Sequence, residues 1–396
     1  MRAEEQIIAE MGKLAQLAYK KLGGHDGYNI GDIIPDFEDK EKTYKLNSKY
    51  RVIDYTDEWT DMQALLLERG ETDNNGNFKG SGEYVLAFRG TKGWVDVGVD
   101  TIIGLGNINI QYYHAEEFTQ KALAKIASDK GCSIDEAKSY LTLTGHSLGG
   151  ILTQQIGARF HIKGYAYNPY GVDRLLSLPP NYPGISDMFL SIALYKIMET
   201  VGLTKVHANW AYEHISTISY QDEGAINGDI LSNWATNISS THLGKFTPIF
   251  GKNLGGEGHG IANLNHAISE YNNILKHFNS SVTYKELTKV YLATAMIHKG
   301  KGYETLQSEF KKIGVFESQD NSLNLDIITS GLNLQNAFSP KSIATPALYA
   351  LIHLNPFIVS NINSPVYKEL EKHRNEYSDN YIKDRSKMFE AVLVYP

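Results

Sequence analysis

Between Asp61 and Thr91 two largely apolar runs flank a polar stretch, and this pattern predicts two strands joined by a turn. The runs MQALLLER (62–69) and EYVLAFRGT (83–91) are rich in strand-forming residues, and the polar stretch TDNNGN (72–77) separates them. An Asn-Asn-Gly-Asn sequence between two extended runs is typical of a hairpin turn. We therefore predict a β-hairpin here.

After this hairpin the apolar positions change between a helical period and short continuous runs. Phe118, Leu123 and Ile126 share one face of a helix predicted at 114–128. Strands that alternate with helices indicate an α/β fold, in which a mostly parallel sheet is covered by helices on both faces. The further elements predicted in chain order are strand 140–144, helix 148–160, strand 164–168, strand 214–220 and helix 259–278.

The N-terminal segment predicts an amphipathic helix that ends at Gly23-Gly24. Acidic residues stand where a signal peptide has its basic region, so we expect no cleavable signal peptide. The apolar positions with helical spacing are Ile7, Ile8, Met11, Leu14, Leu17 and Ala18.

From about Val282 the pattern changes to helices and loops without clear strands, and a charged amphipathic helix is predicted near Ser364–Leu393. We therefore predict two parts, a domain at 1–281 and a helical C-terminal region at 282–396. The uncharged stretch Ile343–Val359 approaches the length of a membrane span. Because it contains Pro346 and Pro356, a buried helix bounded by prolines is the better interpretation.

Composition narrows the classes of function. The 396 residues are 42% apolar and 21% charged, with a formal net charge of -7, so no basic surface for nucleic acid is indicated. Cys132 is the only cysteine. A disulfide framework is therefore excluded, and neither a metal nor a cofactor is expected.

The motif GHSLG (145–149) lies between a predicted strand and a predicted helix. A sharp strand-to-helix turn exposes a serine hydroxyl to a substrate carbonyl, at the cost of an unfavourable backbone conformation at the serine. Gly145 and Gly149 would remove the collisions that side chains cause where strand and helix nearly touch. We therefore predict Ser147 as a nucleophile. The alternative is an ordinary glycine-rich turn in which Ser147 caps the helix.

An oxyanion hole needs backbone amides from two different segments. The amide of Leu148 lies at the start of the predicted helix, where the helix dipole favours negative charge. Thr91 follows Arg89-Gly90 at the end of another predicted strand. Leu148 and Thr91 are therefore the candidate oxyanion donors.

Several segments together resemble the class 3 lipases, the fungal-lipase-like branch of the α/β-hydrolases. They are LAFRGT (86–91) followed by Trp94 and Asp96, YYHAEEF (112–118) and LTGHSLGG (143–150), and the resemblance covers about residues 50–280. It implies an α/β-hydrolase sheet, a Ser-Asp-His triad in that chain order, hydrolysis of acyl esters and often a mobile lid. Glu117 departs from the family's H-x-G-F pattern, which has glycine at that position.

The general base should be a histidine after the strand at 214–220. His242, His259, His266 and His277 remain of the 13 histidines, and the last two lie inside a predicted helix. His259 is flanked by glycines just ahead of this helix, and HGIANL (259–264) resembles the HSIDNL pattern of related lipases. We prefer His259, and His242 and His266 stay open as alternatives.

The acid of the triad has two main candidates. Asp222 comes two residues after the strand at 214–220, where a carboxylate is rigid and half-buried. Asp229 better resembles the family's pattern but lies further from the sheet. We prefer Asp222, with Asp229 as the alternative acid and Glu223 as a third possibility.

Two apolar stretches would govern access to Ser147. One is 94–110, after the oxyanion loop, and the other is an insertion at about 171–206 that includes YPGISDMFLSIALYKIMETVG (182–202). An apolar cap or lid suits acyl chains better than sugars or peptides. The sequence therefore predicts a serine lipase or A1-type phospholipase. The alternatives are a lipid- or partner-binding protein with an inactive hydrolase shell, and a non-lipid esterase or thioesterase.

The expected substrate is a lipid at a membrane surface, with no nucleic-acid partner. The C-terminal region resembles the helical tails of bacterial toxin-like lipases, which implies a chaperone or an immunity partner and an effector role. Without a signal peptide or a membrane span, we expect a cytoplasmic protein or one exported by a leaderless route, and the location stays open.

Overall fold

The structure is a computed structural model that places about half of the chain. The chain divides into two compact units, one of Glu10–Ile218 with Ile230–Phe246, and one of Met1–Ala9, Ser219–Asp229 and Thr247–Pro396. The described residues are 3–39, 42–58, 62–90, 97–169, 203–222, 242–251, 260–275, 283–284, 323–324 and 359–360.

A mixed eight-stranded sheet has the order β1-β4-β5-β6-β7-β8-β9-β10. Strands β1, β4, β5 and β6 pair antiparallel, and β6, β7, β8 and β9 pair parallel to one another. The strands are β1 (Ile33–Ile34), β4 (Lys49–Asp57), β5 (Gln63–Thr72), β6 (Phe78–Phe88), β7 (Leu141–His146), β8 (Gly164–Tyr167), β9 (Ile215–Asp222) and β10 (Lys245–Gly251).

These pairings confirm the α/β class and the hairpin of β5 and β6. Asp73 closes the hairpin turn, because its carboxylate accepts hydrogen bonds from the backbone amides of Asn75 and Asn77, both at 2.8 Å. Together with the side-chain amide of Asn77, these bonds lower the pKa of Asp73. The sequence did not predict β10. A separate pair, β2 (Phe37–Asp39) and β3 (Lys42–Tyr44), is also antiparallel.

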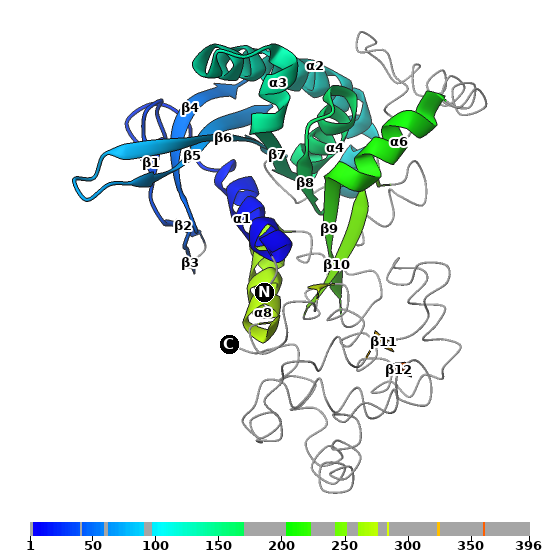
Figure 1. Cartoon of the computed structure of the whole chain (residues 1–396). Coiled ribbons are helices and arrows are strands. Elements are labelled where there is room, and N and C mark those ends of the chain that lie inside the picture. Colours follow the sequence, from blue (N-terminus) through cyan, green and yellow to red (C-terminus); the bar gives the residue numbers. More distant parts are fainter. Residues whose placement is uncertain are drawn as a thin grey trace, which may run out of the picture. The chain divides into compact units, whose positions relative to one another are not determined.

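One face of the sheet is covered by α2 (Val97–Lys130), α3 (Ile134–Ala137) and α4 (Leu148–Phe160), as Figure 1 shows. Side chains on alternate positions of β6, namely Tyr84, Leu86 and Phe88, enter a core cluster with residues of these helices. Strand geometry explains the choice, since successive side chains point to opposite faces. The helix members of this cluster are Tyr112, Ala115, Phe118, Ala122, Leu123, Ile126, Ala127, Ala137, Leu152 and Ile156.

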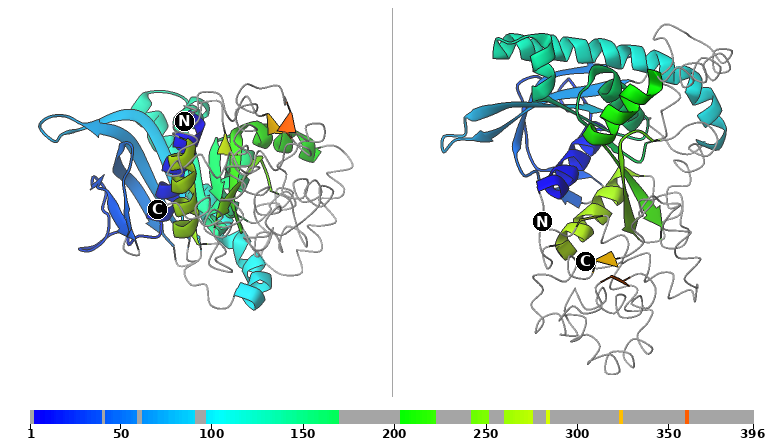
Figure 2. Two further views of the ribbon diagram at one scale, coloured as in Figure 1. Left: turned by 90° about the horizontal axis from the view of Figure 1, so that it is seen from below. Right: turned by 45° about the vertical axis from the view of Figure 1, so that its right-hand side comes forward.

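The helix α1 (Ala3–Leu17) approaches the opposite face, and Figure 2 agrees with Figure 1 on this placement. The hydroxyl of Thr144 in β7 donates to the backbone oxygen of Met11 at 3.0 Å. The expected apolar face of α1 is confirmed, because Met11, Leu14 and Leu17 are buried. The helix ends at Leu17 rather than at Gly23, because hydrogen-bonded turns at residues 18–20 replace its last predicted turn.

Two helices differ in length from their predictions. α2 extends from Val97 to Lys130, so the apolar segment at 97–110 belongs to the same helix as the predicted stretch at 114–128. α8 (Ile261–Leu275) is shorter at both ends than the helix predicted at 259–278. A further helix, α6 (Leu203–His214), precedes β9 and packs on α4 through Trp210 and Ala211.

In the other unit the hydroxyl of Tyr284 joins two helical segments. It donates to the backbone oxygen of Glu5 at 3.0 Å and lies 2.6 Å from the Asn272 side-chain oxygen. Burial raises the pKa of Tyr284 well above its usual range. In the C-terminal region, β11 (Leu323–Asn324) and β12 (Val359–Ser360) pair parallel, which the sequence did not predict. The helical C-terminal region otherwise stays a prediction.

None of the described helices is long and apolar enough to cross a membrane.

Leu86 offers a test of the core. Its side chain is fully buried between β6 and the helices, so Leu86→Ala should lower the free energy of unfolding by about 2–5 kcal/mol. Ile134 is 53% exposed, and Ile134→Ala should change it by less than about 0.5 kcal/mol. Urea unfolding followed by circular dichroism measures both. Equal losses in the two variants would contradict the described core.

Candidate functional site

Ser147 occupies the turn between β7 and α4 and has an unusual backbone conformation. Its φ of 56° and ψ of −119° lie outside the regions that residues with a side chain normally adopt. Such a conformation costs about 1–3 kcal/mol and persists only where the surroundings enforce it. The backbone amide of Ser147 donates to the backbone oxygen of Tyr167 in β8 at 2.9 Å. The backbone oxygen of Ser147 accepts from the amide of Ile151 in α4 at 3.0 Å. The turn is thus fixed to the sheet on one side and to α4 on the other.

The hydroxyl of Ser147 does not cap α4. Ser147 stands at the N-cap position, but its side chain makes no capping hydrogen bond. The part of the alternative in which the Ser147 side chain caps α4 is therefore wrong. A residue that accepts backbone strain without capping the helix is typical of functional sites.

The two glycines of the motif stand where a side chain would collide with backbone. A Cβ at Gly145 would overlap the carbonyl group of Gly149, as the sequence predicted for a strand and a helix in close approach. A Cβ at Gly149 would lie 2.8 Å from the carbonyl carbon of Phe88 and 2.9 Å from that of Arg89. Gly149 therefore makes room for the end of β6 rather than for β7.

The end of β6 also approaches Ser147 itself. A Cβ at Gly90 would lie 2.6 Å from the backbone oxygen of His146 and 3.1 Å from the Cβ of Ser147. Parallel pairing of β6 and β7 produces this approach, since Phe88 is opposite Gly145 in the register. Thr91 directly follows Gly90, and it lies outside the described residues.

The amide of Leu148 is the first of α4. The first amides of a helix have no acceptor within it, and the helix dipole adds a partial positive charge at this end. The side chain of Leu148 packs against a second apolar cluster, of which Ile151 and Ile215 are members. This packing holds the first turn of α4 at the sheet.

Most of the predicted acids and bases cannot be placed. β9 runs through Asp222, so Asp222 is the last residue of the strand instead of lying two residues after it. The side chain of Asp222 is not described. Glu223, Asp229, His259 and His277 also lie outside the described residues.

The two other candidate histidines are described. His242 stacks on Phe246, with ring centroids 5.6 Å apart. Gly244, two residues later, packs on the backbone of Ile215, the first residue of β9. In the register of the sheet, Ile215 pairs with Gly164 of β8, and Gly164 pairs with Leu143 near the start of β7. His242 is thus near the amino ends of the parallel strands, and Ser147 is at their carboxyl ends, which does not favour His242 as the base. His266 lies on α8, inside the helix as predicted, and is exposed.

Sequence reasoning missed a tyrosine beside the predicted nucleophile. The hydroxyl of Tyr19 lies 2.7 Å from Nδ1 of His146, which directly precedes Ser147 and is 2% exposed. A Cβ at Gly90 would also overlap the Tyr19 hydroxyl. Tyr19 and His146 are 127 positions apart, and no local pattern relates them. The only signal in the sequence was a polar aromatic residue at the end of an otherwise apolar helix face.

No model of a known protein family matches the sequence, and no curated protein matches it significantly. What the chain does must therefore be inferred from the site itself.

Among the described residues, no group of three histidine, cysteine, aspartate or glutamate side chains could hold a metal ion.

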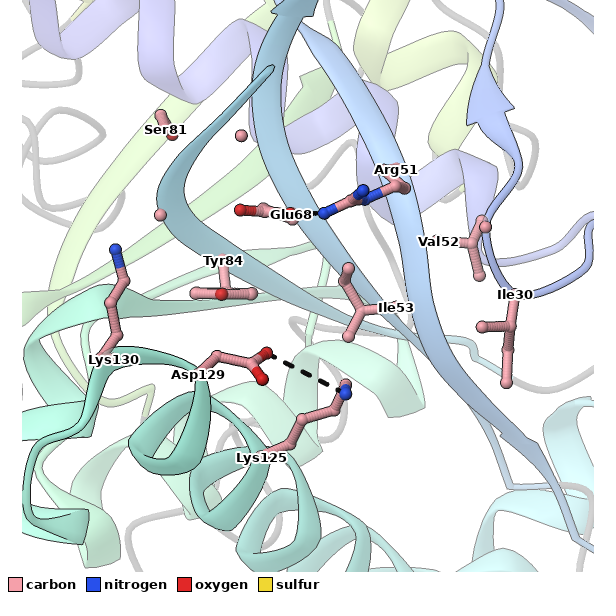
Figure 3. A pocket seen from close by; sticks show the side chains of 13 residues that line it. Ile30, Arg51, Val52, Ile53, Glu68, Ser81, Tyr84, Lys125, Asp129 and Lys130 are labelled. Atoms are coloured by element: carbon pink, nitrogen blue, oxygen red, sulfur yellow. Dashed lines mark hydrogen bonds and ion pairs between the residues drawn. The ribbon is translucent and has the colours of Figure 1, made fainter. Parts of the chain in front are cut away.

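A pocket of about 650 Å³ lies elsewhere, along the amino-terminal half of β6 (Figure 3). Four of its five charged side chains form two ion pairs, Arg51 with Glu68 at 2.6 Å and Lys125 with Asp129 at 4.0 Å, and the Lys130 amine lies over the Tyr140 ring. Burial, with Glu68 and Asp129 nearby, raises the pKa of Tyr84 in this pocket to about 12, so its phenol is neutral at pH 7. From β6 this pocket is lined by Gly80, Ser81, Gly82 and Tyr84, whereas Ser147 is next to Gly90, which follows the strand.

Gly149 offers a test of the turn. A methyl group in Gly149→Ala would meet the backbone of Phe88 and Arg89, which cannot rotate away as a side chain can. We expect the free energy of unfolding to fall by about 1–3 kcal/mol. Gly131 is the control, because it has open space around its Cβ position and a φ of +63° that asparagine tolerates. Asparagine adopts this φ more readily than other side chains, so Gly131→Asn should lose less stability than Gly149→Ala. Urea unfolding compares the two, and a neutral Gly149→Ala would contradict the described approach of β6.

Proposed function

We propose that this protein is a serine hydrolase of the α/β-hydrolase type that cleaves carboxylic ester bonds of lipids, as a lipase or an A1-type phospholipase. The observation that carries the proposal is the strained backbone of Ser147 at a strand-to-helix turn. Its side chain does not cap the helix, and the end of β6 lies beside it. A folded chain keeps such strain where it supports function. The motifs of the class 3 lipases at the same residues add a fold-level analogy.

In the proposed reaction Ser147 attacks the ester carbonyl and forms an acyl-enzyme. His259 takes the proton of the hydroxyl and then transfers it to the leaving alcohol. Asp222, or alternatively Asp229, orients His259 and stabilises its charged form. Water then attacks the acyl-enzyme, with His259 again as the base, and releases the fatty acid.

The negative charge that develops on the carbonyl oxygen needs donors that are already in place. We assign this role to the amides of Leu148 and Thr91. Support for Thr91 comes from Gly90, the residue just before it, which lies beside Ser147. Support for Leu148 comes from its place at the start of α4, where the helix dipole stabilises an anion. One donor directly after the nucleophile and a second from the segment after a neighbouring strand is the arrangement of an oxyanion hole in α/β-hydrolases.

The lipid substrate follows from the apolar stretches at 94–110 and 171–206. The side chains of both stretches lie outside the described residues, and their role as a cap or lid stays a prediction. The chaperone or immunity partner, the effector role and the location stay predictions as well.

Ser147→Ala should abolish the activity. We expect ester hydrolysis to fall by at least about 10⁴-fold and covalent labelling by a fluorophosphonate to be lost, because the attacking oxygen is removed. Ser219→Ala is the matched control, since Ser219 is also a buried serine in the sheet, 1% exposed. This variant should keep both ester hydrolysis and covalent labelling at the wild-type level. Labelling located by peptide mass spectrometry at a serine other than Ser147 would refute the assignment. No labelling of the wild type would favour a binding protein with an inactive hydrolase shell.

The substrate class has its own test. Vesicles of phosphatidylcholine with palmitoyl at sn-1 and oleoyl at sn-2, and emulsions of a triglyceride, are incubated with the protein, and the products are identified by mass spectrometry. An A1-type phospholipase releases palmitate and leaves the oleoyl lysolipid, whereas a lipase releases fatty acid from the triglyceride. Hydrolysis of p-nitrophenyl acetate without any hydrolysis of either lipid would contradict the lipid assignment and favour a non-lipid esterase. Ser147→Ala serves as the blank in each reaction.

A further inference from the structure

We propose that Tyr19 is a positioning residue of this site, whose hydroxyl holds the turn that carries Ser147 against the loop after β6. The inference rests on the proposed hydrolase function for its catalytic meaning. The contacts that carry it lie within one unit of the chain and involve only described residues.

The first contact is with the residue that precedes Ser147. The hydroxyl of Tyr19 lies 2.7 Å from Nδ1 of His146, and the two ring centroids are 5.7 Å apart. His146 is the last residue of β7 and is 2% exposed, so its ring has little freedom to move. A hydrogen bond to a buried ring restrains the backbone of His146 at the point where the strand ends and the strained residue begins.

The second contact is with the loop after β6. A Cβ placed on Gly90 would overlap the Tyr19 hydroxyl. It would also lie 2.6 Å from the backbone oxygen of His146 and 3.1 Å from the Cβ of Ser147. The hydroxyl, the end of β7 and the nucleophile therefore converge on the backbone of one glycine. The proposed donors Leu148 and Thr91 follow directly in the sequence after Ser147 and Gly90. The convergence therefore restrains the residues that precede the two donors.

The backbone of Tyr19 is itself clamped. The side-chain amide of Gln63 donates to the backbone oxygens of Ala18 and Lys20, both at 2.9 Å, which are the residues on either side of Tyr19. Gln63 in turn accepts a hydrogen bond from the guanidinium of Arg89, and its backbone oxygen accepts from the amide of Arg89 at 2.9 Å. Arg89 directly precedes Gly90 and is 2% exposed.

These bonds connect the segments around Gly90. They run from Arg89 through Gln63 to the turn at residues 18–20, and from the Tyr19 hydroxyl to His146, while the close approach of Gly90 to His146 and Ser147 brings the two ends together. Connected hydrogen bonds restrain their members more than separate pairs do. Strand pairing already holds the turn on the β8 side through the amide of Ser147. Tyr19 supplies the restraint on the side of β6, where the proposed oxyanion would form.

A positioning role and a role in substrate binding predict different kinetics. If Tyr19 sets the spacing of the donors, loss of its hydroxyl lowers kcat and leaves KM nearly unchanged, because the interaction matters most in the transition state. If Tyr19 only contacts substrate, loss of its hydroxyl raises KM. If it only packs the fold, Tyr19→Phe changes the melting temperature but not the rate at temperatures where the protein is folded.

Tyr19→Phe is the test, because it removes the hydroxyl and keeps the ring. We expect kcat for ester hydrolysis, and the rate at which a fluorophosphonate labels Ser147, to fall about tenfold with KM within about twofold. Tyr55→Phe is the matched control, since its hydroxyl lies 2.7 Å from the Cβ position of Gly23, in the segment that follows Tyr19. It should keep the wild-type rate. Labelling of Tyr19→Phe at the wild-type rate would overturn the proposal, as would an equal loss in the two variants.

Two substitutions at His146 check that the bond acts through this partner. His146→Asn keeps a polar atom near the position of Nδ1 and should retain more activity than His146→Leu. Combining Tyr19→Phe with His146→Leu should cost no more than His146→Leu alone, because both remove the same bond. Additive losses would contradict the pairing.

Hydrogen exchange separates this inference from the proposed function. In Tyr19→Phe, but not in Tyr55→Phe, the peptides that contain Gly90 and Ser147–Gly150 should exchange their amides faster. A wild type that is not labelled by the fluorophosphonate, together with this faster exchange, would refute the hydrolase and keep the clamp. Exchange that is unchanged in Tyr19→Phe would refute the clamp whether or not the protein is a hydrolase.

Discussion

The site depends on a steric constraint at the carboxyl ends of β6 and β7, where three backbone segments approach so closely that only hydrogen fits between them. Gly145 faces the backbone of Gly149, Gly149 faces the ends of Phe88 and Arg89, and Gly90 faces His146 and Ser147. Each contact joins a different pair among β6, β7 and α4. The helix is thereby brought directly onto the strand ends, and the residue that joins β7 to α4 has a positive φ. That residue is Ser147.

A strained residue in this position needs compensation from its surroundings. The described part of β7 supplies it through pairing on both sides, with β6 and with β8, and through complete burial of Leu143 and Thr144. Thr144 also donates to the oxygen of Met11 in α1, which ties the strand to the helix on the other face. A cost of about 1–3 kcal/mol at one residue is small beside the burial of several large apolar side chains at about 1.5–3 kcal/mol each. Burial around β7, in the middle of the sheet, therefore offsets the strain at the turn.

Local features of the chain predicted the nucleophile turn well. The bounds of α4 were predicted as observed, because a glycine-rich start and a helical apolar period are both local signals. The hairpin of β5 and β6 was predicted from its turn residues for the same reason. The end of α1 was wrong by several residues, since Gln63, far along the chain, binds the backbone oxygens of Ala18 and Lys20 in non-helical turns. β10 was missed because Lys245–Gly251 contains a proline and shows no strand-like alternation.

The long-range part of the site could not be predicted in this way. Gly149 was expected to make room for β7, and the structure shows that it makes room for β6, which requires knowing that the two strands are neighbours. Tyr19 and His146 belong to distant segments, and each looks unremarkable in its own stretch of sequence. A periodic pattern indicates which face of an element is buried, but it does not indicate which element covers it. The order of the proposed triad came only from a resemblance to a family, for the same reason.

The N-terminal segment bears on the proposed chemistry because it contacts the end of β7 that carries Ser147. The turn at Ser147 lies at the end of β7, with α4 on one face of the sheet. The N-terminal segment approaches β7 from the opposite face. Electrostatic stabilisation of an oxyanion is effective only if the donors are fixed before charge develops, because donors that must reorient lose much of the energy they supply. The position of the Leu148 amide is set by the first turn of α4, which packs on the second apolar cluster. On the side of β6, Gly90 is met by the Tyr19 hydroxyl as well as by His146 and Ser147, so the turn of Tyr19 supplies a restraint from another segment. The N-terminal segment is on this view part of the site, although its sequence carries no motif.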